Sequence, residues 1–143
     1  MSTDTTTTTG LMTGKRGLIM GVANERSIAW GIAEALAAAG AELAFTYQTE
    51  AFSRRVIPLA ESVGSDFTLS CDVVDDYDLD RVFAAFDDRW PALDFVVHAI
   101  AYSDKNELKG RYADTSRDNF RTTMDVSCFS FTNVARRAAP LMH

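Results

Sequence analysis

Apolar and polar positions follow two alternating periods along the chain from residue 15 onward. Short apolar runs, typical of strands, are separated by longer segments in which apolar residues recur at helical spacing. The runs predict strands at residues 15–21, 41–47, 66–71 and 93–100. The longer segments predict helices at residues 27–39, 50–63, 78–90 and 116–139, with a polar loop at 101–114 before the last of them. The resulting order is β-α-β-α-β-α-β-α.

This order predicts an α/β fold with a parallel sheet. Right-handed crossovers place helices on both faces of such a sheet, and ligands bind at the carboxyl ends of its strands. The near-continuous apolar run at 93–100 is typical of a strand buried on both faces. Residues 115–118, Thr-Ser-Arg-Asp, fit a capping box for the last helix, with Asp as the acidic partner.

The composition permits one enzyme-sized domain and excludes several classes of partner. With 143 residues, 47% of them hydrophobic, the chain can bury one ordinary core. A net charge of -6 argues against nucleic acid, because the chain offers no basic stripe to displace counterions from phosphates. No apolar run approaches the roughly 20 residues that span a membrane. We therefore expect a cytoplasmic protein.

Residues 1–12 differ in composition from the rest of the chain. Residues 1–12 form a polar, Thr-rich tract that resembles neither a secretion signal nor an organelle address, and we expect it to be a disordered tail. Residues 13–143 are expected to form part of a single domain. Cys71 and Cys128 lie in different elements without a Cys-x-x-Cys or His partner, which indicates reduced thiols rather than a disulfide or zinc site.

A glycine and serine motif marks the junction of the first strand and first helix. Five residues separate Gly21 from Ser27, and three separate Ser27 from Gly31. Gly21 allows a sharp turn, and Ser27 can cap the helix while its backbone N–H and that of Ile28 face an anion. The motif predicts a pyrophosphate site, with a capped turn that binds nothing as the alternative. Its spacing is not that of Gly-x-Gly-x-x-Gly.

The run Gly-x5-Ser-Ile-Ala-x-Gly at residues 21–31 resembles the cofactor loop of bacterial NADH-dependent enoyl-acyl-carrier-protein reductases, which are divergent short-chain dehydrogenases/reductases of type II fatty-acid synthesis. The resemblance extends from Met12 to the end of the chain, about half of the usual length. It implies a Rossmann-type doubly wound parallel sheet, truncated after the fourth strand and its following helix. Residues 13–143 would be the N-terminal dinucleotide-binding part.

The second and third strand ends supply further cofactor candidates. Gln48 stands where ordinary NAD-binding folds place an acid, and it can hydrogen-bond a ribose or adenine edge. Neither Gln48 nor Thr49 is basic, so a 2′-phosphate has no obvious partner and NADH is the expected cofactor. The resemblance implies that Asp72 accepts from the adenine amine while Val73 packs on the ring.

The fourth strand end resembles the family's Ser-Ile-Gly-Phe, here Ala-Ile-Ala-Tyr at residues 99–102. The resemblance implies that Ile100 contacts the nicotinamide ribose and that Ser103 contacts substrate, although Ala101 in place of Gly narrows the space beside it. His98 precedes this motif on an apolar strand, where a lone histidine is more often a hydrogen-bonded core residue than a proton-transfer group.

The family's reaction adds a hydride from NADH to an enoyl thioester on acyl carrier protein, with a helical Tyr and Lys seven residues apart. The resemblance places that pair after the next strand, beyond His143. We therefore assign no catalytic residue to this chain and expect it to be inactive alone. Tyr102 and Lys109 have the same spacing, but they lie in the predicted polar loop.

The sequence also allows three other interpretations. The acidic run at 72–80 suggests a calcium loop, but Arg81 stands where that loop needs Gly, so we expect no metal and instead a helix N-terminus. The chain could also be a non-catalytic NADH-binding module, or part of a related ketoacyl reductase.

The family resemblance implies a homotetramer, and the apolar residues spread around the predicted helix 116–139 suit contact with another subunit.

Overall fold

The computed structural model describes residues 10–142. Most of the expected polar tail, residues 1–12, therefore lies outside the described residues. Residues 10–14 form a turn, in which the Met12 N–H donates to the Ala39 carbonyl oxygen over 2.9 Å. This contact places the start of the described chain beside the end of the first helix.

Four parallel strands form one sheet in the order β3-β2-β1-β4. Their bounds are Arg16–Met20 for β1, Glu42–Tyr47 for β2, Thr68–Ser70 for β3 and Phe95–His98 for β4. Met20 pairs with Thr46 on one side and with His98 on the other, so β1 and β4 end at the same level and β2 ends one residue further on. The predicted α/β fold, a Rossmann-type parallel sheet, is confirmed.

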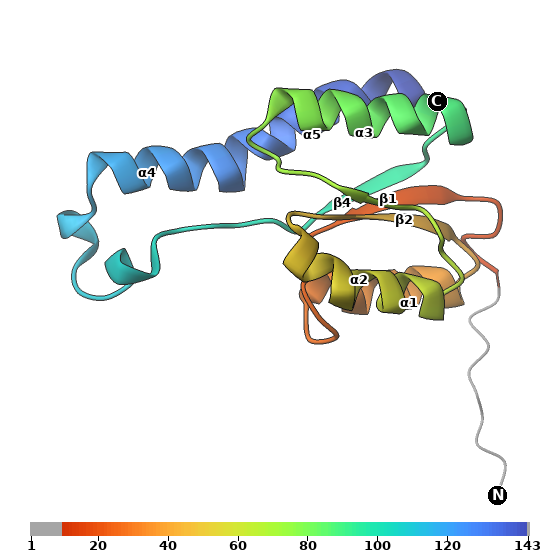
Figure 1. Cartoon of the computed structure of the whole chain (residues 1–143), viewed down its shortest axis with the longest axis horizontal. Helices are drawn as coiled ribbons and strands as arrows, with labels where there is room; N and C mark the ends of the chain where they lie inside the picture. Colours follow the sequence, from red (N-terminus) through yellow and green to blue (C-terminus); the bar gives the residue numbers. More distant parts are fainter. Residues whose placement is uncertain (1–9, 143) are drawn as a thin grey trace, which may run out of the picture.

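Helices cover both faces of this sheet, as Figure 1 shows. α1 (Ile28–Ala38) and α2 (Glu50–Ser62) lie on one face, and α3 (Asp76–Arg89) and α5 (Ser130–Ala138) lie on the other. β1 separates two apolar cores: Ile19 packs with Trp30 and Phe45, whereas Leu18 packs toward α3 with Phe86. The sheet is therefore fixed from both sides.

β4 departs from its prediction. All four of its residues are half-buried rather than buried, and among residues 10–142 its only strand neighbour is β1. The expectation of a strand buried on both faces is therefore wrong for the described chain. The apolar run itself forms a strand, which lies at the edge of the sheet in residues 10–142.

The predicted helix 116–139 is divided. α4 (Arg117–Met124) is followed by a π-helical turn, Asp125–Phe129, and then by α5, with a short 3-10 turn at Ala139–Leu141. α4 extends well beyond the sheet (Figure 1). The loop before it contains 3-10 turns at Lys105–Glu107 and Tyr112–Asp114.

The predicted capping box is also corrected. Ser116, rather than Thr115, is the N-cap of α4, and its Oγ accepts from the Asn119 N–H at 3.1 Å. The acidic partner is Glu107 from the preceding loop rather than Asp118, because its carboxylate accepts from both the N–H and the hydroxyl of Ser116 at 2.7 Å.

We predict that Gly21→Ala destabilises the fold. Gly21 has φ +109°, and a Cβ there would lie 2.1 Å from the Ala99 carbonyl oxygen. Backbone strain and overpacking together should cost roughly 2–4 kcal/mol in the free energy of unfolding. Urea unfolding followed by the fluorescence of the buried Trp30 and Trp90 measures this change.

Gly31→Ala is the matched control for this substitution. A Cβ at Gly31 meets no atom within 4 Å, and Gly31 lies inside α1. The substitution should therefore raise stability by about 0.5–1 kcal/mol. Equal midpoints for the two variants would contradict the close approach at Gly21.

Candidate functional site

The carboxyl ends of all four strands meet around a cavity of about 560 Å³, which we call the strand-end cavity. Five residues predicted from the sequence line it: Gly21, Gln48, Asp72, Val73 and Ile100. Its volume lies within the usual range of small-molecule sites. The topology therefore gathers at one edge residues that lie far apart in the sequence.

A second space of about 610 Å³, the helix-end hollow, adjoins the strand-end cavity. Ser27 and Ile28 line it, and it shares Gly21 and Ile100 with the strand-end cavity. The N-terminus of α1 opens into this hollow. Of the eight predicted site residues, only Ser103 lines neither space.

The role expected for the Ser27 side chain is wrong. Ser27 is the N-cap of α1, but its hydroxyl makes no capping bond. Its Oγ instead accepts from the N–H groups of Ala23, at 2.9 Å, and Asn24, at 3.1 Å, while its own N–H donates to the Asn24 carbonyl. Ser27 therefore closes the loop after β1, because a hydroxyl can bond backward as well as forward.

The Ile28 N–H is a free donor at this helix end. Within residues 10–142 it has no hydrogen-bond acceptor, and the Ile28 side chain is 81% exposed. A helix N-terminus with an unused N–H favours an anion. Of the two N–H groups expected to face an anion, only that of Ile28 is free to do so.

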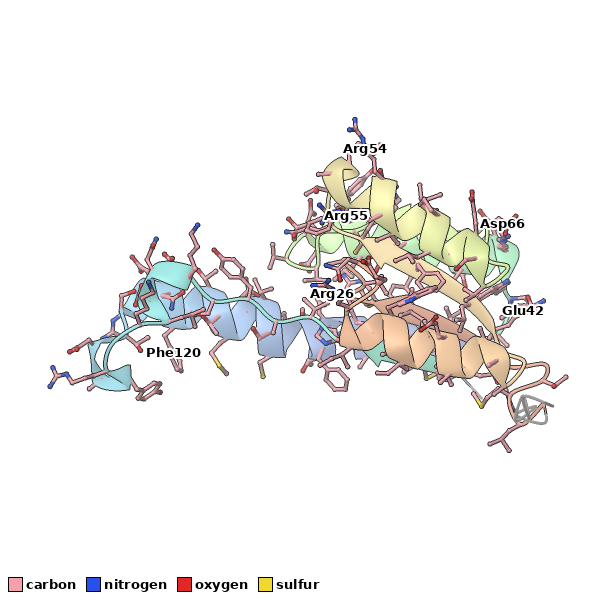
Figure 2. All side chains as sticks on the ribbon, turned by 90° about the horizontal axis from the view of Figure 1, so that it is seen from below. Arg26, Glu42, Arg54, Arg55, Asp66 and Phe120 are labelled. Carbon is pink, nitrogen blue, oxygen red and sulfur yellow. The ribbon has the colours of Figure 1, made fainter. Side chains whose placement is uncertain are left out.

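Gln48 follows β2 at the mouth of the strand-end cavity. Two neighbours that the sequence did not single out, Tyr47 and Phe52, also line the cavity. Arg54 and Arg55 line neither space, and Arg54 points away from the sheet in Figure 2. The wall beside Gln48 is therefore uncharged.

Asp72 and Val73 follow β3, directly before α3. The Asp72 Oδ1 accepts from the Val74 N–H at 3.2 Å, which leaves Oδ2 with no hydrogen-bond partner in the described chain. Val73 packs in the core next to the cavity. Asp75 caps α3 by accepting from two N–H groups, so the predicted link between the acidic run and a helix N-terminus is confirmed.

Cys71 lines the strand-end cavity but offers no nucleophile. Burial, followed by the charge of Asp78, raises the pKa of its thiol to about 12. The thiol is therefore protonated at neutral pH, and it contributes an apolar surface. Cys71 and Cys128 are both free, the first buried and the second exposed.

His98 ends β4 and contacts the start of α5. Its Nε2 lies 2.8 Å from the Ser130 Oγ, and Ser130 donates its hydroxyl proton to the Val126 carbonyl oxygen at 2.6 Å. His98 must then be the donor in the first bond, which places its proton on Nε2. The Phe131 ring packs edge-on against it. His98 is hydrogen-bonded and half-buried, as expected.

Ser103 is turned toward α4. Its Oγ accepts from the Asn119 Nδ2 at 3.0 Å and lies 3.1 Å from the Thr123 Oγ1. The Asn119 Oδ1 in turn accepts from the Asp104 N–H at 2.9 Å. In this conformation Ser103 anchors the loop after β4 to α4, so a substrate contact remains a prediction.

Tyr102 and Lys109 do not share a helix. Tyr102 lies in the irregular segment after β4, where its N–H donates to the Ser127 Oγ at 2.9 Å. Lys109 lies in a bend after the 3-10 turn Lys105–Glu107, and its side chain is exposed. The two side chains therefore lack the common helix face that a Tyr and Lys pair with this spacing needs.

The π-helical turn and the helices on either side of it supply cavity residues that the sequence did not indicate. Thr122 and Val126 line the strand-end cavity, and Ser127 and Phe131 line the helix-end hollow. The helical spacing of these residues is visible in the sequence. The π turn, however, determines which face of the helical segment meets the end of β4. No local signal in the sequence marks that turn.

Two features are not found in residues 10–142. No helix there is both long and apolar enough to pass through a bilayer. Nor do three or more His, Cys, Asp or Glu side chains gather where they could hold a metal ion.

We predict that stability falls as the pH drops below about 6.5 because of His98. Burial holds the pKa of His98 below its ordinary value of 6.5. As the pH falls, His98 therefore binds a proton in the unfolded chain before it does so in the folded one. The contribution of neutral His98 to the free energy of unfolding is complete above pH 6.5 and is lost as the pH falls below that value. Thermal unfolding between pH 7.5 and 5.5 measures it. His98→Gln keeps an N–H donor without titrating, and an unchanged pH slope in that variant would contradict the assignment.

Comparison with known proteins gives the same family from sequence and structure. The family model described as Enoyl-(Acyl carrier protein) reductase matches residues 21–143. Enoyl-[acyl-carrier-protein] reductase [NADH] 2 of Rhizobium meliloti is 69% identical over 133 residues, which are 93% of this chain and 50% of the relative. Reductase [NADH] 1 of the same organism is 61% identical, over 94% of this chain and 49% of the relative.

Solved structures agree with these relatives. FabI from Candidatus Liberibacter asiaticus superposes with a TM-score of 0.92 at 59% identity, over 93% of this chain and 52% of that one. The Anaplasma phagocytophilum reductase in complex with NAD superposes with a TM-score of 0.89 at 58% identity, over 92% of this chain and 50% of that one. The chain spans about half the length of the curated relatives that it matches. Because the family match runs from Gly21 through the rest of the sequence, the chain belongs to the enoyl-(acyl carrier protein) reductase family.

Proposed function

We propose that this chain is the NADH-binding half of an enoyl-[acyl-carrier-protein] reductase of type II fatty-acid biosynthesis. The observation that carries the proposal is the pair of adjoining spaces at the strand ends, lined by seven of the eight residues predicted from the sequence. Relatives named as NADH-dependent reductases support the choice of reaction and cofactor. The substrate is an enoyl thioester carried by acyl carrier protein.

The cofactor would lie across both spaces. Asp72 accepts from the adenine amine through its free Oδ2, and Val73 supports the ring. Gln48 bonds the adenosine ribose. This assignment is supported by the cavity wall, in which Asp72 is the only charged side chain among the lining residues.

The pyrophosphate would lie at the N-terminus of α1, where the Ile28 N–H is free to donate. Gly21 lets the loop after β1 pass close to residue 99 beside this position, because a Cβ there would lie 2.1 Å from the Ala99 carbonyl oxygen. Ser27 closes the loop around this position, and Ile100 borders both spaces near the nicotinamide ribose. Bound NADH supplies the hydride for the enoyl double bond.

The chain's own residues bind and orient the cofactor but are not assigned the proton transfer. Tyr102 and Lys109, which have the expected spacing, do not share a helix. We place the catalytic Tyr and Lys in the other half of the full-length protein. Ser103 is proposed as a substrate contact that must first leave Asn119 and Thr123.

We further propose that the full-length protein is a homotetramer in the cytoplasm. α4, the π-helical turn and the start of α5 expose large apolar side chains, among them Phe120, Met124, Phe129 and Phe131 at 43–58% exposure. Phe120 projects from α4 in Figure 2. An apolar patch of this kind on a protruding helix suits contact with a second copy. The unpaired thiols of Cys71 and Cys128 support a reducing compartment.

We predict that this chain alone does not reduce enoyl thioesters, whereas the same chain continued by the C-terminal half of the Rhizobium meliloti reductase 2 does. We call the second protein the extended chain. NADH absorbance is followed with crotonyl thioester, and NADH affinity is measured by calorimetry.

The outcomes separate the proposed functions. Turnover by the 143-residue chain at the rate of the extended chain would contradict the assignment of catalysis to the other half. NADH binding by the extended chain without turnover would favour the non-catalytic module. If the extended chain binds no NADH, the cofactor assignment fails.

We predict that the extended chain prefers NADH and that Gln48→Arg moves the preference toward NADPH. A guanidinium at this uncharged wall offers the 2′-phosphate a charge-assisted hydrogen bond, which should change the ratio of kcat/KM values by about 10-fold. Arg54→Gln is the control, because Arg54 does not line the strand-end cavity and points away from the sheet in Figure 2. Equal kcat/KM values for the two cofactors before substitution would contradict the role of Gln48.

A further inference from the structure

Asp72 follows the shortest strand of the sheet. β3 consists of three half-buried residues at the edge of the sheet. The Cys71 N–H extends its ladder by donating to the Tyr47 carbonyl oxygen at 2.8 Å, and the Asp75 N–H closes a turn onto the Asp72 carbonyl oxygen at 3.0 Å. An acid that accepts one specific hydrogen bond needs a fixed direction. These backbone bonds leave the Asp72 N–H without a backbone acceptor, so side chains outside the strand supply the remaining support.

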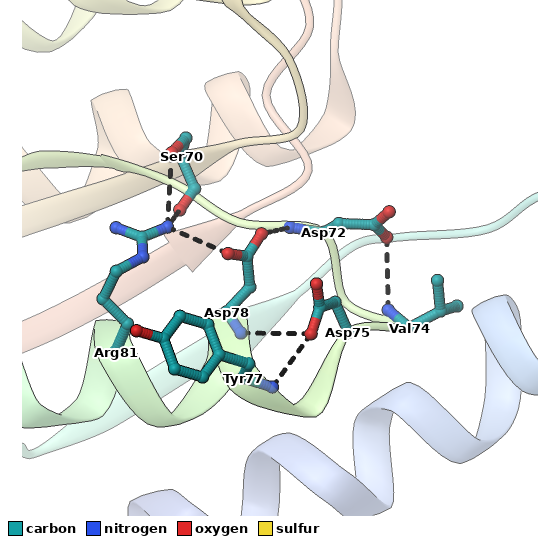
Figure 3. Close-up of polar contacts among 7 residues, drawn as sticks. All are labelled: Ser70, Asp72, Val74, Asp75, Tyr77, Asp78 and Arg81. Atoms are coloured by element: carbon teal, nitrogen blue, oxygen red, sulfur yellow. Dashed lines mark hydrogen bonds and ion pairs between the residues drawn. The ribbon is translucent and has the colours of Figure 1, made fainter.

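Two side chains of α3 provide that support, as Figure 3 shows. The Asp78 Oδ2 accepts from the Asp72 N–H at 2.9 Å. The Arg81 Nη2 donates to the Ser70 carbonyl oxygen at 2.5 Å and lies 3.3 Å from the Asp78 Oδ1. The backbone is thus held on both sides of Cys71, by an acceptor at Asp72 and a donor at Ser70.

The start of α3 is itself fixed. The Asp75 Oδ1 accepts from the N–H groups of Tyr77, at 2.9 Å, and Asp78, at 3.4 Å (Figure 3). Asp78 therefore projects from a capped first turn. Its pKa lies below the ordinary 3.8, first because of the bond from the Asp72 N–H and then because of Arg81. Asp78 is therefore ionised at neutral pH.

We propose that Asp78 and Arg81 are positioning residues for cofactor recognition, and that they hold the Asp72 carboxylate toward the adenine. This inference rests on the proposed function, because it requires that Asp72 bind adenine. Neither Asp78 nor Arg81 lines the strand-end cavity, so both act through the backbone at residues 70–72. The Asp72 carboxylate keeps one oxygen on the Val74 N–H and presents the other.

The test uses the extended chain and compares Asp72→Ala, Asp78→Ala, Arg81→Ala and the double variant Asp72→Ala/Asp78→Ala. Asp78→Ala and Arg81→Ala should each raise the Kd and KM for NADH about 5- to 10-fold while kcat changes less than about 2-fold. The double variant should bind NADH no more weakly than Asp72→Ala, because Asp78 acts through Asp72.

Two competing ligands separate positioning from general damage to the fold. ADP-ribose contains the adenine end and nicotinamide mononucleotide does not, so only inhibition by ADP-ribose should weaken in Asp78→Ala. Asp78→Asn keeps an oxygen acceptor for the Asp72 N–H, and it should recover most of the affinity even if Asp78→Ala folds poorly. Asp88→Ala removes an exposed acid from the same helix and should change nothing.

The results distinguish the adenine contact of Asp72 from the positioning role of Asp78. Unchanged NADH affinity in Asp72→Ala would overturn the adenine contact and with it the positioning role. Weakened binding in Asp72→Ala with unchanged binding in Asp78→Ala would overturn the positioning role alone. Additive losses in the double variant, or equal loss of both competing ligands, would show that Asp78 acts elsewhere.

Discussion

The carboxyl ends of β1 and β4 lie so close together that no side chain fits between them. The Ala99 N–H donates to the Met20 carbonyl at 3.0 Å, so the strand ladder continues one residue past β4. The next residue of the β1 chain is Gly21, and it leaves the sheet through a backbone conformation with positive φ. This close approach brings the loop after β1 against residues 99–102. Both spaces of the candidate site share that boundary.

The packing of β1 keeps this arrangement in register. Leu18 and Met20 are buried toward α3, while Ile19 is buried toward α1 and α2. A slip of one residue would exchange the two faces and disrupt both cores at once. The strand ends therefore stay level, which a site assembled from several loops requires.

The sequence predicted the order of elements and the strand ends because both depend on the spacing of apolar residues, which the two cores impose. It failed where a polar group had a choice of partners. The Ser27 hydroxyl bonds backward to Ala23 and Asn24, and Ser116 takes Glu107 from a loop as its partner. The spacing of the last helix persists through the π turn, so it could not reveal Asp125–Phe129. The half-buried state of β4 depends on contacts outside its own sequence.

Most of these unpredicted bonds join a side chain to the backbone of a strand-end loop. Ser127 contacts both the N–H and the carbonyl of Tyr102, as Asp78 contacts the N–H of Asp72. The strand-end cavity itself presents one charged side chain, Asp72, beside a protonated thiol at Cys71. With only one charged group available to a ligand, affinity must depend on how firmly that group is held before binding. Substitutions that loosen the loops can therefore weaken cofactor binding without touching a residue in the cavity wall.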